Sequence, residues 1–146
     1  MIENFTLTEK LITFTKKYSS WKEAIIESSR PLLENGYVTQ SYINSIINSI
    51  IEHGPYIVII PNVAIPHARP ETGSIKVGFS VTLLEEPVAF SELPEHRVRL
   101  LLTLSGLNVE THLEMLKAIV KVIADKDKFE RIIKATTKQE ILELFK

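Results

Sequence analysis

The sequence predicts an α/β protein: a three-layer α/β/α sandwich around a central mixed β-sheet. Two patterns carry this prediction. Apolar residues recur at helical spacing in the first third of the chain and again in the last third, whereas the middle third shows the composition and alternation of strands. A sheet covered on both faces would bury the apolar stripes of helices that precede and follow the strands.

The first third of the chain is expected to hold one strand and two helices. Lys10–Tyr18 is rich in β-branched and aromatic residues and reads as a strand. Ser20–Glu23 has the spacing of a capping box and should open a helix, which Pro31 is expected to kink or break. A second helix opens at Thr39 and ends at His53–Pro55, where glycine can cap the helix and proline cannot continue it.

The remaining elements are predicted from the spacing of apolar residues, which changes to that of strands in the middle third and back to that of helices in the last third. The three strands expected are Tyr56–Ile60, which reads as buried, Ile75–Leu84 and Val98–Ser105. The three helices expected after them are Val109–Ala124, Lys126–Lys134 and Thr137–Phe145, the last of which begins with another capping box.

Length and composition are those of one soluble domain. The chain has 146 residues, 45% apolar and 24% charged, which is close to the globular average. No linker rich in proline, glycine or serine divides it, so we expect a single domain over residues 1–146. There are no cysteines, which excludes disulfides, thiolate metal sites and cysteine nucleophiles.

Charge and hydropathy argue against nucleic acid and membrane partners. Seventeen basic and eighteen acidic residues give a net charge of −1, which provides no long-range field to attract nucleic acid or anionic lipid. The apolar run Tyr56–Ile60 is far shorter than the roughly 20 residues of a membrane-spanning helix, so no direct membrane insertion is expected. Met1–Thr6 lacks the basic and apolar segments of a secretory signal, and the expected location is therefore cytoplasmic.

His67 is the first candidate for chemistry. Pro66 and Pro70 make its loop stiff and non-helical, and Ala68 is too small to cover it. An imidazole that titrates near neutral pH has a free ring nitrogen with which to attack phosphorus or bind a metal. From these residues alone, a surface histidine without a role is an equally good interpretation.

His112 is the second candidate, because it follows the last predicted strand, Val98–Ser105, at the start of a helix. Strand ends and helix N-termini are where α/β sheets bind anions, through free N–H groups and the helix dipole. If the sheet joins the loops of His67 and His112, a nucleophile would lie beside a phosphate-binding helix start. The alternative is a histidine that ends the apolar stripe of a core helix. His53, at a helix C-terminus, is explained structurally by its favourable interaction with the dipole.

Other catalytic classes lack their motifs. The four histidines, His53, His67, His96 and His112, match no compact metal-ligand spacing, so a zinc site is not expected. There is no G-x-S-x-G elbow of a serine hydrolase and no glycine-rich nucleotide loop. We therefore expect neither a metal nor a bound cofactor.

The segment Ala64–Ala68 resembles the active-site signature of the enzyme IIA proteins of the bacterial sugar phosphotransferase system, in the mannitol/fructose-type superfamily. Within that superfamily, His53–Tyr56 and Pro66–Glu71 look like the ascorbate-type branch, and the family's second histidine falls on His112. The resemblance implies that His67 accepts a phosphoryl group from the phosphohistidine of HPr. It would then pass the group to a cysteine of an enzyme IIB, which phosphorylates a sugar, here L-ascorbate, moving through a membrane enzyme IIC.

The sequence departs from this family at one position. Mannitol and fructose members carry an Arg-Glu pair ahead of the strand, and the arginine contributes to their site, whereas this chain has Glu52–Gly54 there. Arg69 and His53 are the two candidates to supply the missing positive charge to phosphate or partner. Three carboxylates are expected around the site: Glu71, Glu85 and Glu86.

Two other roles use the same fold. One is a regulatory module that is phosphorylated, or merely bound, without passing phosphate to a sugar system. The other is a cytoplasmic domain of anion transporters in which the histidine can be absent, and the intact Pro66–His67 argues against it. A metal-dependent hydrolase is a distant third alternative.

Overall fold

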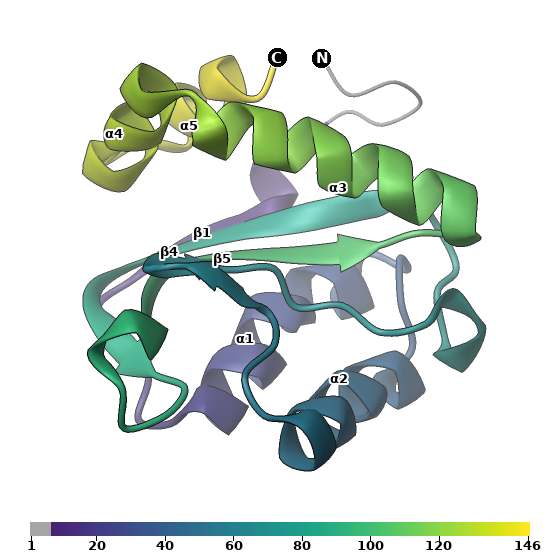
Figure 1. Cartoon of the computed structure of the whole chain (residues 1–146). Helices are drawn as coiled ribbons and strands as arrows, with labels where there is room; N and C mark the ends of the chain where they lie inside the picture. Colours follow the sequence, from purple (N-terminus) through teal and green to yellow (C-terminus); the bar gives the residue numbers. More distant parts are fainter. Residues whose placement is uncertain (1–6) are drawn as a thin grey trace.

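A computed structural model describes residues 7–146 as a five-stranded mixed sheet with helices on both faces (Figure 1). The strands are β1 (Ile12–Thr15), β2 (Val58–Ile60), β3 (Asn62–Ala64), β4 (Gly78–Ala89) and β5 (Arg97–Ser105). The helices are α1 (Trp21–Glu34) and α2 (Gln40–His53) on one face, and α3 (Val109–Ala124), α4 (Lys126–Lys134) and α5 (Lys138–Leu144) on the other. This arrangement confirms the predicted three-layer α/β/α sandwich. Met1–Thr6, interpreted above as lacking a secretory signal, lies outside the described residues.

The order of the strands, β1-β4-β5-β3-β2, explains where loops from distant parts of the chain meet. β1 is parallel to β4 and β3 is parallel to β5, while β4 with β5 and β2 with β3 are antiparallel. Because β3 and β5 are parallel neighbours, their carboxyl ends lie at the same edge of the sheet. The loop after β3 and the start of α3 therefore meet at that edge.

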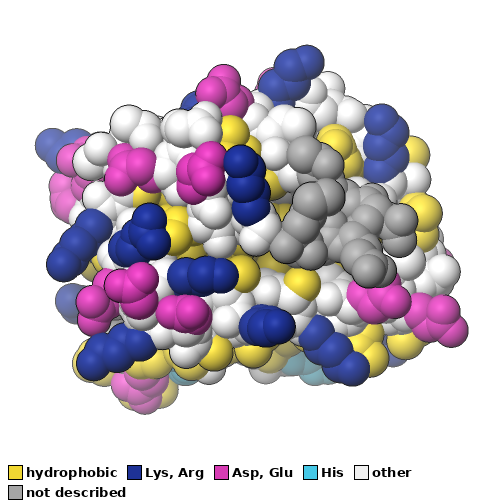
Figure 2. Space-filling view, turned by 90° about the horizontal axis from the view of Figure 1, so that it is seen from above, with side chains coloured by type: hydrophobic (Ala, Val, Ile, Leu, Met, Phe, Trp, Pro, Cys, Tyr) yellow, Lys and Arg dark blue, Asp and Glu magenta, His cyan; other side chains and the backbone are white. Residues whose placement is uncertain are grey.

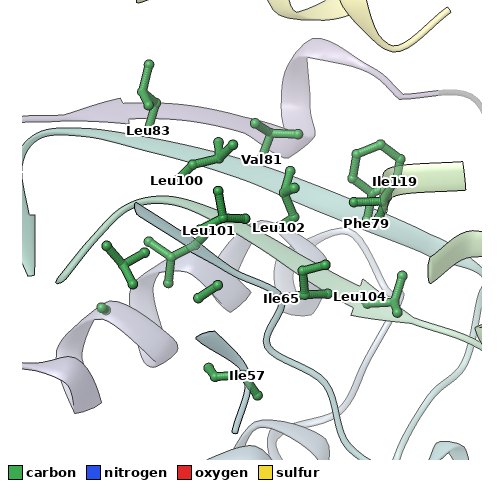
Figure 3. Packing of buried hydrophobic residues seen from close by; sticks show 14 of the residues in the cluster. Ile57, Ile65, Phe79, Val81, Leu83, Leu100, Leu101, Leu102, Leu104 and Ile119 are labelled. Carbon is green, nitrogen blue, oxygen red and sulfur yellow. The ribbon is translucent and has the colours of Figure 1, made fainter. Parts of the chain in front are cut away.

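The two faces of the sheet differ in polarity, yet both are buried. On the face toward α3, Phe79, Val81 and Leu83 of β4 lie opposite Leu104, Leu102 and Leu100 of β5 (Figure 3). The opposite face carries hydroxyls. Ser80 Oγ donates to the backbone oxygen of Ser28 in α1 at 2.7 Å, and Ser28 Oγ lies 3.2 Å from Thr103 Oγ1. These hydrogen bonds satisfy the hydroxyls of Ser28, Ser80 and Thr103 beneath α1, whereas Ser29 Oγ and Thr82 Oγ1 are buried there without a partner among residues 7–146.

Local capping signals fixed most of the helix ends. Thr39 accepts a hydrogen bond from Tyr42 N at 3.4 Å at the start of α2, and Gly54 ends that helix with a φ of 80°. Such a left-handed conformation costs glycine little because it has no Cβ. Thr137 and Glu140 form the predicted capping box of α5. α3 and α4 have the predicted bounds.

Of the two predicted effects of Pro31, a kink or a break, the break in the first helix is wrong. α1 continues through Pro31 to Glu34, and Leu32, directly after the proline, is completely buried. Asn35 Nδ2 donates to the backbone oxygen of Pro31 at 2.7 Å at the end of the helix. Packing of the apolar face against the sheet contributes more to this last turn than the proline costs it.

The predicted buried strand Tyr56–Ile60 is instead a short strand at the edge of the sheet. Among the described strands β2 is last in the order and pairs with β3, and Ile59 and Ile60 are 42% and 40% exposed. A run of apolar residues does not distinguish a central strand from an edge strand. The same hairpin includes β3, for which no strand was predicted.

Within residues 7–146, no helix has the length and apolarity needed to cross a membrane. Basic and acidic side chains are interspersed on the face formed by α3, α4 and α5, as Figure 2 shows. The described part of this face therefore shows no single-sign patch of the kind that binds polyanions.

Candidate active site

His67 lies on a short loop that follows β3 and is fixed to the sheet. Its half-buried side chain has Nδ1 2.7 Å from the backbone oxygen of Ile65. Because a carbonyl oxygen can only accept, Nδ1 must carry the proton of the neutral ring. The other ring nitrogen, Nε2, then holds the lone pair. The geometry therefore leaves Nε2 as the ring nitrogen of His67 that is available to attack or to accept a hydrogen bond.

Buried Tyr42 of α2 anchors this loop to β5. Its hydroxyl accepts from Ala68 N at 3.2 Å and donates to the backbone oxygen of Leu104 at 2.5 Å. The next contact along the loop is a backbone hydrogen bond from Leu104 N to Pro66 O at 2.9 Å. Burial raises the pKa of Tyr42, so its hydroxyl remains a donor at neutral pH. His67 is thus held between two backbone attachments.

His112 lies beside His67, with the centroids of the two rings 5.0 Å apart. It is the fourth residue of α3, and its backbone N–H donates to Asn108 O at 3.0 Å. The backbone N–H of His112 is therefore used within the helix, so its side chain is the group that faces the neighbouring histidine. Burial, and secondarily the proximity of His67, lower the pKa of His112, which is therefore neutral at pH 7.

A cleft of about 570 Å³ joins all four of the residues selected from the sequence. Its lining residues are Ser49, His53, Tyr56, His67, Ala68, Arg69, Pro70, Val109 and His112. Arg69 and His53 are both exposed, and His53 Nε2 lies 3.8 Å from Glu52 Oε2. The cleft thus contains the lone pair of His67 Nε2, the neutral imidazole of His112 and an exposed guanidinium, a combination suited to handling an anion.

Of the three carboxylates expected around the site, two lie elsewhere. Gly78 pairs with Ser105 at the His67 end of the sheet, whereas Glu85 and Glu86 follow Leu84 toward the other end of β4. Because β4 is antiparallel to β5, its carboxyl end, with both carboxylates, lies at the end of the sheet opposite the cleft. Exposed Glu71 borders a groove next to the cleft. Among residues 7–146, no three His, Cys, Asp or Glu side chains are placed to hold a metal ion.

Sequence reasoning missed two residues that shape the site. Tyr56 was assigned to a buried strand, but its ring is 42% exposed and lines the cleft. Gly106 lies so close to α3 that a Cβ there would be 2.8 Å from the Cα of His112. The sequence around Tyr56 and Gly106 does not reveal these contacts, because each contact is made with a residue from a distant segment of the chain.

Gly106→Ala should displace His112 from His67. The added methyl group would also lie 2.9 Å from both the backbone nitrogen and Cβ of His112, so the start of α3 must move. Overpacking of this kind destabilises by about 1–3 kcal/mol. Chemical denaturation measures the loss, and nuclear Overhauser effects between the two imidazoles report their separation. If the free energy of unfolding and the Overhauser effects were both unchanged, Gly106 would not lie as close to His112 as the structure shows.

The lowered pKa of His112 predicts a loss of stability on acidification. Below the ordinary histidine pKa of 6.5, the unfolded chain binds a proton that folded His112 does not, so the free energy of unfolding decreases as the pH falls. The decrease should continue until the pH passes the lower pKa of the folded state. Urea unfolding across this pH range should show a smaller decrease for His112→Gln than for the wild type. Parallel pH profiles for the two proteins would refute this linkage.

Comparisons with known proteins agree with the fold. Residues 5–146 match the family model described as "Phosphoenolpyruvate-dependent sugar phosphotransferase system, EIIA 2". The mannitol-specific cryptic phosphotransferase enzyme IIA component of Escherichia coli K12 is 34% identical over 136 residues, covering 93% of this chain and 92% of the relative. The ascorbate-specific EIIA component of the same strain is 33% identical over 136 residues, covering 92% and 88%.

A solved structure gives the same result. The solution structure of the mannitol-specific cryptic enzyme IIA from E. coli superposes with a TM-score of 0.87 at 33% identity, covering 95% of this chain and 94% of that one. Together with the family model, which spans nearly all residues, these matches decide the family. The chain belongs to the EIIA 2 family of the phosphoenolpyruvate-dependent sugar phosphotransferase system and is an enzyme IIA phosphotransferase.

Proposed function

We propose that this protein, as one enzyme IIA domain over residues 1–146, carries phosphoryl groups on His67 in the cytoplasm. His67 accepts the group from phospho-HPr and passes it to a cysteine of a cognate enzyme IIB, which serves uptake of L-ascorbate through a membrane enzyme IIC. The observation that carries the proposal is the tautomer of His67. Its Nδ1 donates to Ile65 O, so the lone pair is on Nε2, in a ring that lines an open cleft.

Phosphoryl transfer requires no proton to leave or join Nδ1 of His67. Nε2 of His67 attacks phosphorus in line, an Nε2–P bond forms, and the bond from phosphorus to the donor's histidine nitrogen breaks, returning the electron pair to that nitrogen. In the second step a thiolate of enzyme IIB attacks, and the electron pair of the Nε2–P bond returns to His67. The hydrogen bond from Nδ1 to Ile65 O can persist through both steps.

Neighbouring groups can receive the charge of the phosphoryl oxygens. His112 is neutral, and its ring is near enough to His67 to donate a hydrogen bond to a phosphoryl group on Nε2. We propose Arg69 and His53, both lining the cleft, as the groups that bind the phosphate or the partner in place of the arginine of the mannitol and fructose branch. An E. coli mannitol enzyme IIA of this fold has been solved in complex with phosphorylated enzyme IIB, which supports the acceptor.

The experiment has two stages. The protein is first incubated with phosphoenolpyruvate, enzyme I and HPr, and its intact mass should increase by one phosphoryl group. A protein that gains no phosphoryl group would contradict the proposal. In the second stage, phosphorylated protein is mixed with ascorbate-type and mannitol-type enzymes IIB.

The second stage tests the sugar assignment and the regulatory alternative. Faster transfer to the ascorbate-type enzyme IIB is expected, because His53–Tyr56 and Pro66–Glu71 match that branch. The mannitol-specific and ascorbate-specific relatives are about equally identical in sequence to this chain, so sequence identity does not choose the sugar. The rates of transfer to the two enzymes IIB decide it. Preference for the mannitol-type acceptor would replace the proposed sugar while retaining the carrier. Phosphorylation without transfer to any enzyme IIB would favour a regulatory module.

A further inference from the structure

We propose that Tyr56 is a positioning residue for His67, holding the imidazole and the peptide of His67 in the orientation that presents Nε2 to the cleft. This inference rests on the proposed function of His67 as the phosphoryl acceptor. Two contacts carry it. The Tyr56 hydroxyl donates to the backbone oxygen of His67 at 3.1 Å, and the two rings meet edge to face, with centroids 5.7 Å apart and planes at 88°.

Tyr56 is itself held firmly by the chain around it. It follows Gly54, which has a φ of 80°, and Pro55, whose φ is fixed by its ring. The backbone N–H of Tyr56 donates to Gly54 O at 2.8 Å, and Val58 N donates to Pro55 O at 3.1 Å. The phenol therefore projects from a tight turn between α2 and β2, which directs it toward His67.

The other attachments of the loop do not hold His67 itself. Pro66 O and Ala68 N are bonded to Leu104 and Tyr42, on either side of the histidine. Without Tyr56, the His67 ring would be restrained by its bond to Ile65 O and by contact with His112. Loss of the edge-to-face contact would let the ring rotate, and rotation that broke the Ile65 bond would allow the proton to move to Nε2. That tautomer has no lone pair on Nε2 with which to attack phosphorus.

The same geometry excludes a direct role for Tyr56 as a proton donor to phosphate. A phenol has one hydroxyl proton, and here it is directed to the His67 carbonyl oxygen. Burial raises the pKa of Tyr56, which keeps the phenol protonated and the bond intact at neutral pH. Tyr56 therefore acts through His67 and does not contact the transferred group.

Three variants separate the ring from the hydroxyl. Tyr56→Phe removes the bond to the His67 carbonyl and keeps the ring, and Tyr56→Ala removes both. Ile59→Ala is the matched control, because Ile59 lies on the adjacent strand β2 with the same 42% exposure as Tyr56 and does not line the cleft. All three are compared with the wild type per folded molecule, so that simple destabilisation does not affect the result.

Imidazole nitrogen NMR on the unphosphorylated proteins gives the first readout. Wild type and Ile59→Ala should show His67 as a single Nδ1–H tautomer, and Tyr56→Ala should show a mixture of both tautomers. The second readout is single-turnover phosphorylation by phospho-HPr. Tyr56→Phe should slow it by about 3- to 10-fold with an unchanged apparent KM, as expected for one lost hydrogen bond, and Tyr56→Ala should slow it further.

Wild-type rates in both tyrosine variants, with a single His67 tautomer in each, would overturn the proposal. Equal slowing by Ile59→Ala would also overturn it, because the effect would then belong to the surface in general. The NMR readout requires no phosphoryl donor. If phospho-HPr fails to label the wild type, the proposed function fails while the positioning of His67 by Tyr56 is still tested.

Discussion

His67→Ala should abolish phosphorylation while the protein remains folded. The variant loses the nitrogen that attacks phosphorus. The neighbouring imidazole of His112 belongs to α3 and not to the loop after β3, so it does not take the place of His67. Wild-type protein incubated with phosphoenolpyruvate, enzyme I and HPr should gain one phosphoryl group that is labile in acid and stable in alkali, as phosphohistidine is. Intact-mass measurement on both proteins checks the result, and circular dichroism verifies the fold.

His96→Ala is a matched control for this experiment. His96 is half-buried like His67, but it lies in the short turn before β5, at the opposite end of that strand from the cleft, with its Nδ1 2.6 Å from Ser91 Oγ. It should be phosphorylated as the wild type is. Undiminished labelling of His67→Ala would mean that another histidine accepts the group.

His112→Ala should slow phosphorylation by about 10- to 100-fold without removing the phosphorylation site. Losing a donor that stabilises transition-state charge typically costs about 100- to 1000-fold in rate. The cleft is open to solvent and His112 is only half-buried, so screening by water reduces the expected effect. Rapid-quench kinetics with phospho-HPr, normalised to the folded fraction, measures the rate.

His112→Gln distinguishes a hydrogen-bonding role from a packing role. Glutamine retains a side-chain N–H donor, so part of the lost rate should return if donation to the phosphoryl oxygens matters. If His112 is only a core residue, both variants lower the melting temperature and neither changes the rate per folded molecule. A wild-type rate in folded His112→Ala would show that His67 works without this neighbour.

Much of the fold could be predicted because its signals are local. The capping residues Thr39 and Thr137 mark helix starts through hydrogen bonds to backbone groups three residues away. α3 and α4 were predicted with correct bounds from the return of the helical period, which is also a local pattern. Predictions that depended on neighbours failed: Pro31 is accommodated because Leu32 packs in the core, and Ile59 is exposed because β2 is at the edge of the sheet.

The sequence by itself determined that His67 lies on a stiff loop after a strand and that His112 lies near the start of a later helix, because proline geometry and helix capping act within a few residues. Only the tertiary structure decided that the two imidazoles are neighbours, since this depends on the parallel pairing of β3 with β5. It also decided the tautomer of His67, through Ile65 O, and the contact with Tyr56. Each of these is set by how the folded chain orients one group toward another, which neither hydrophobic periodicity nor residue spacing encodes.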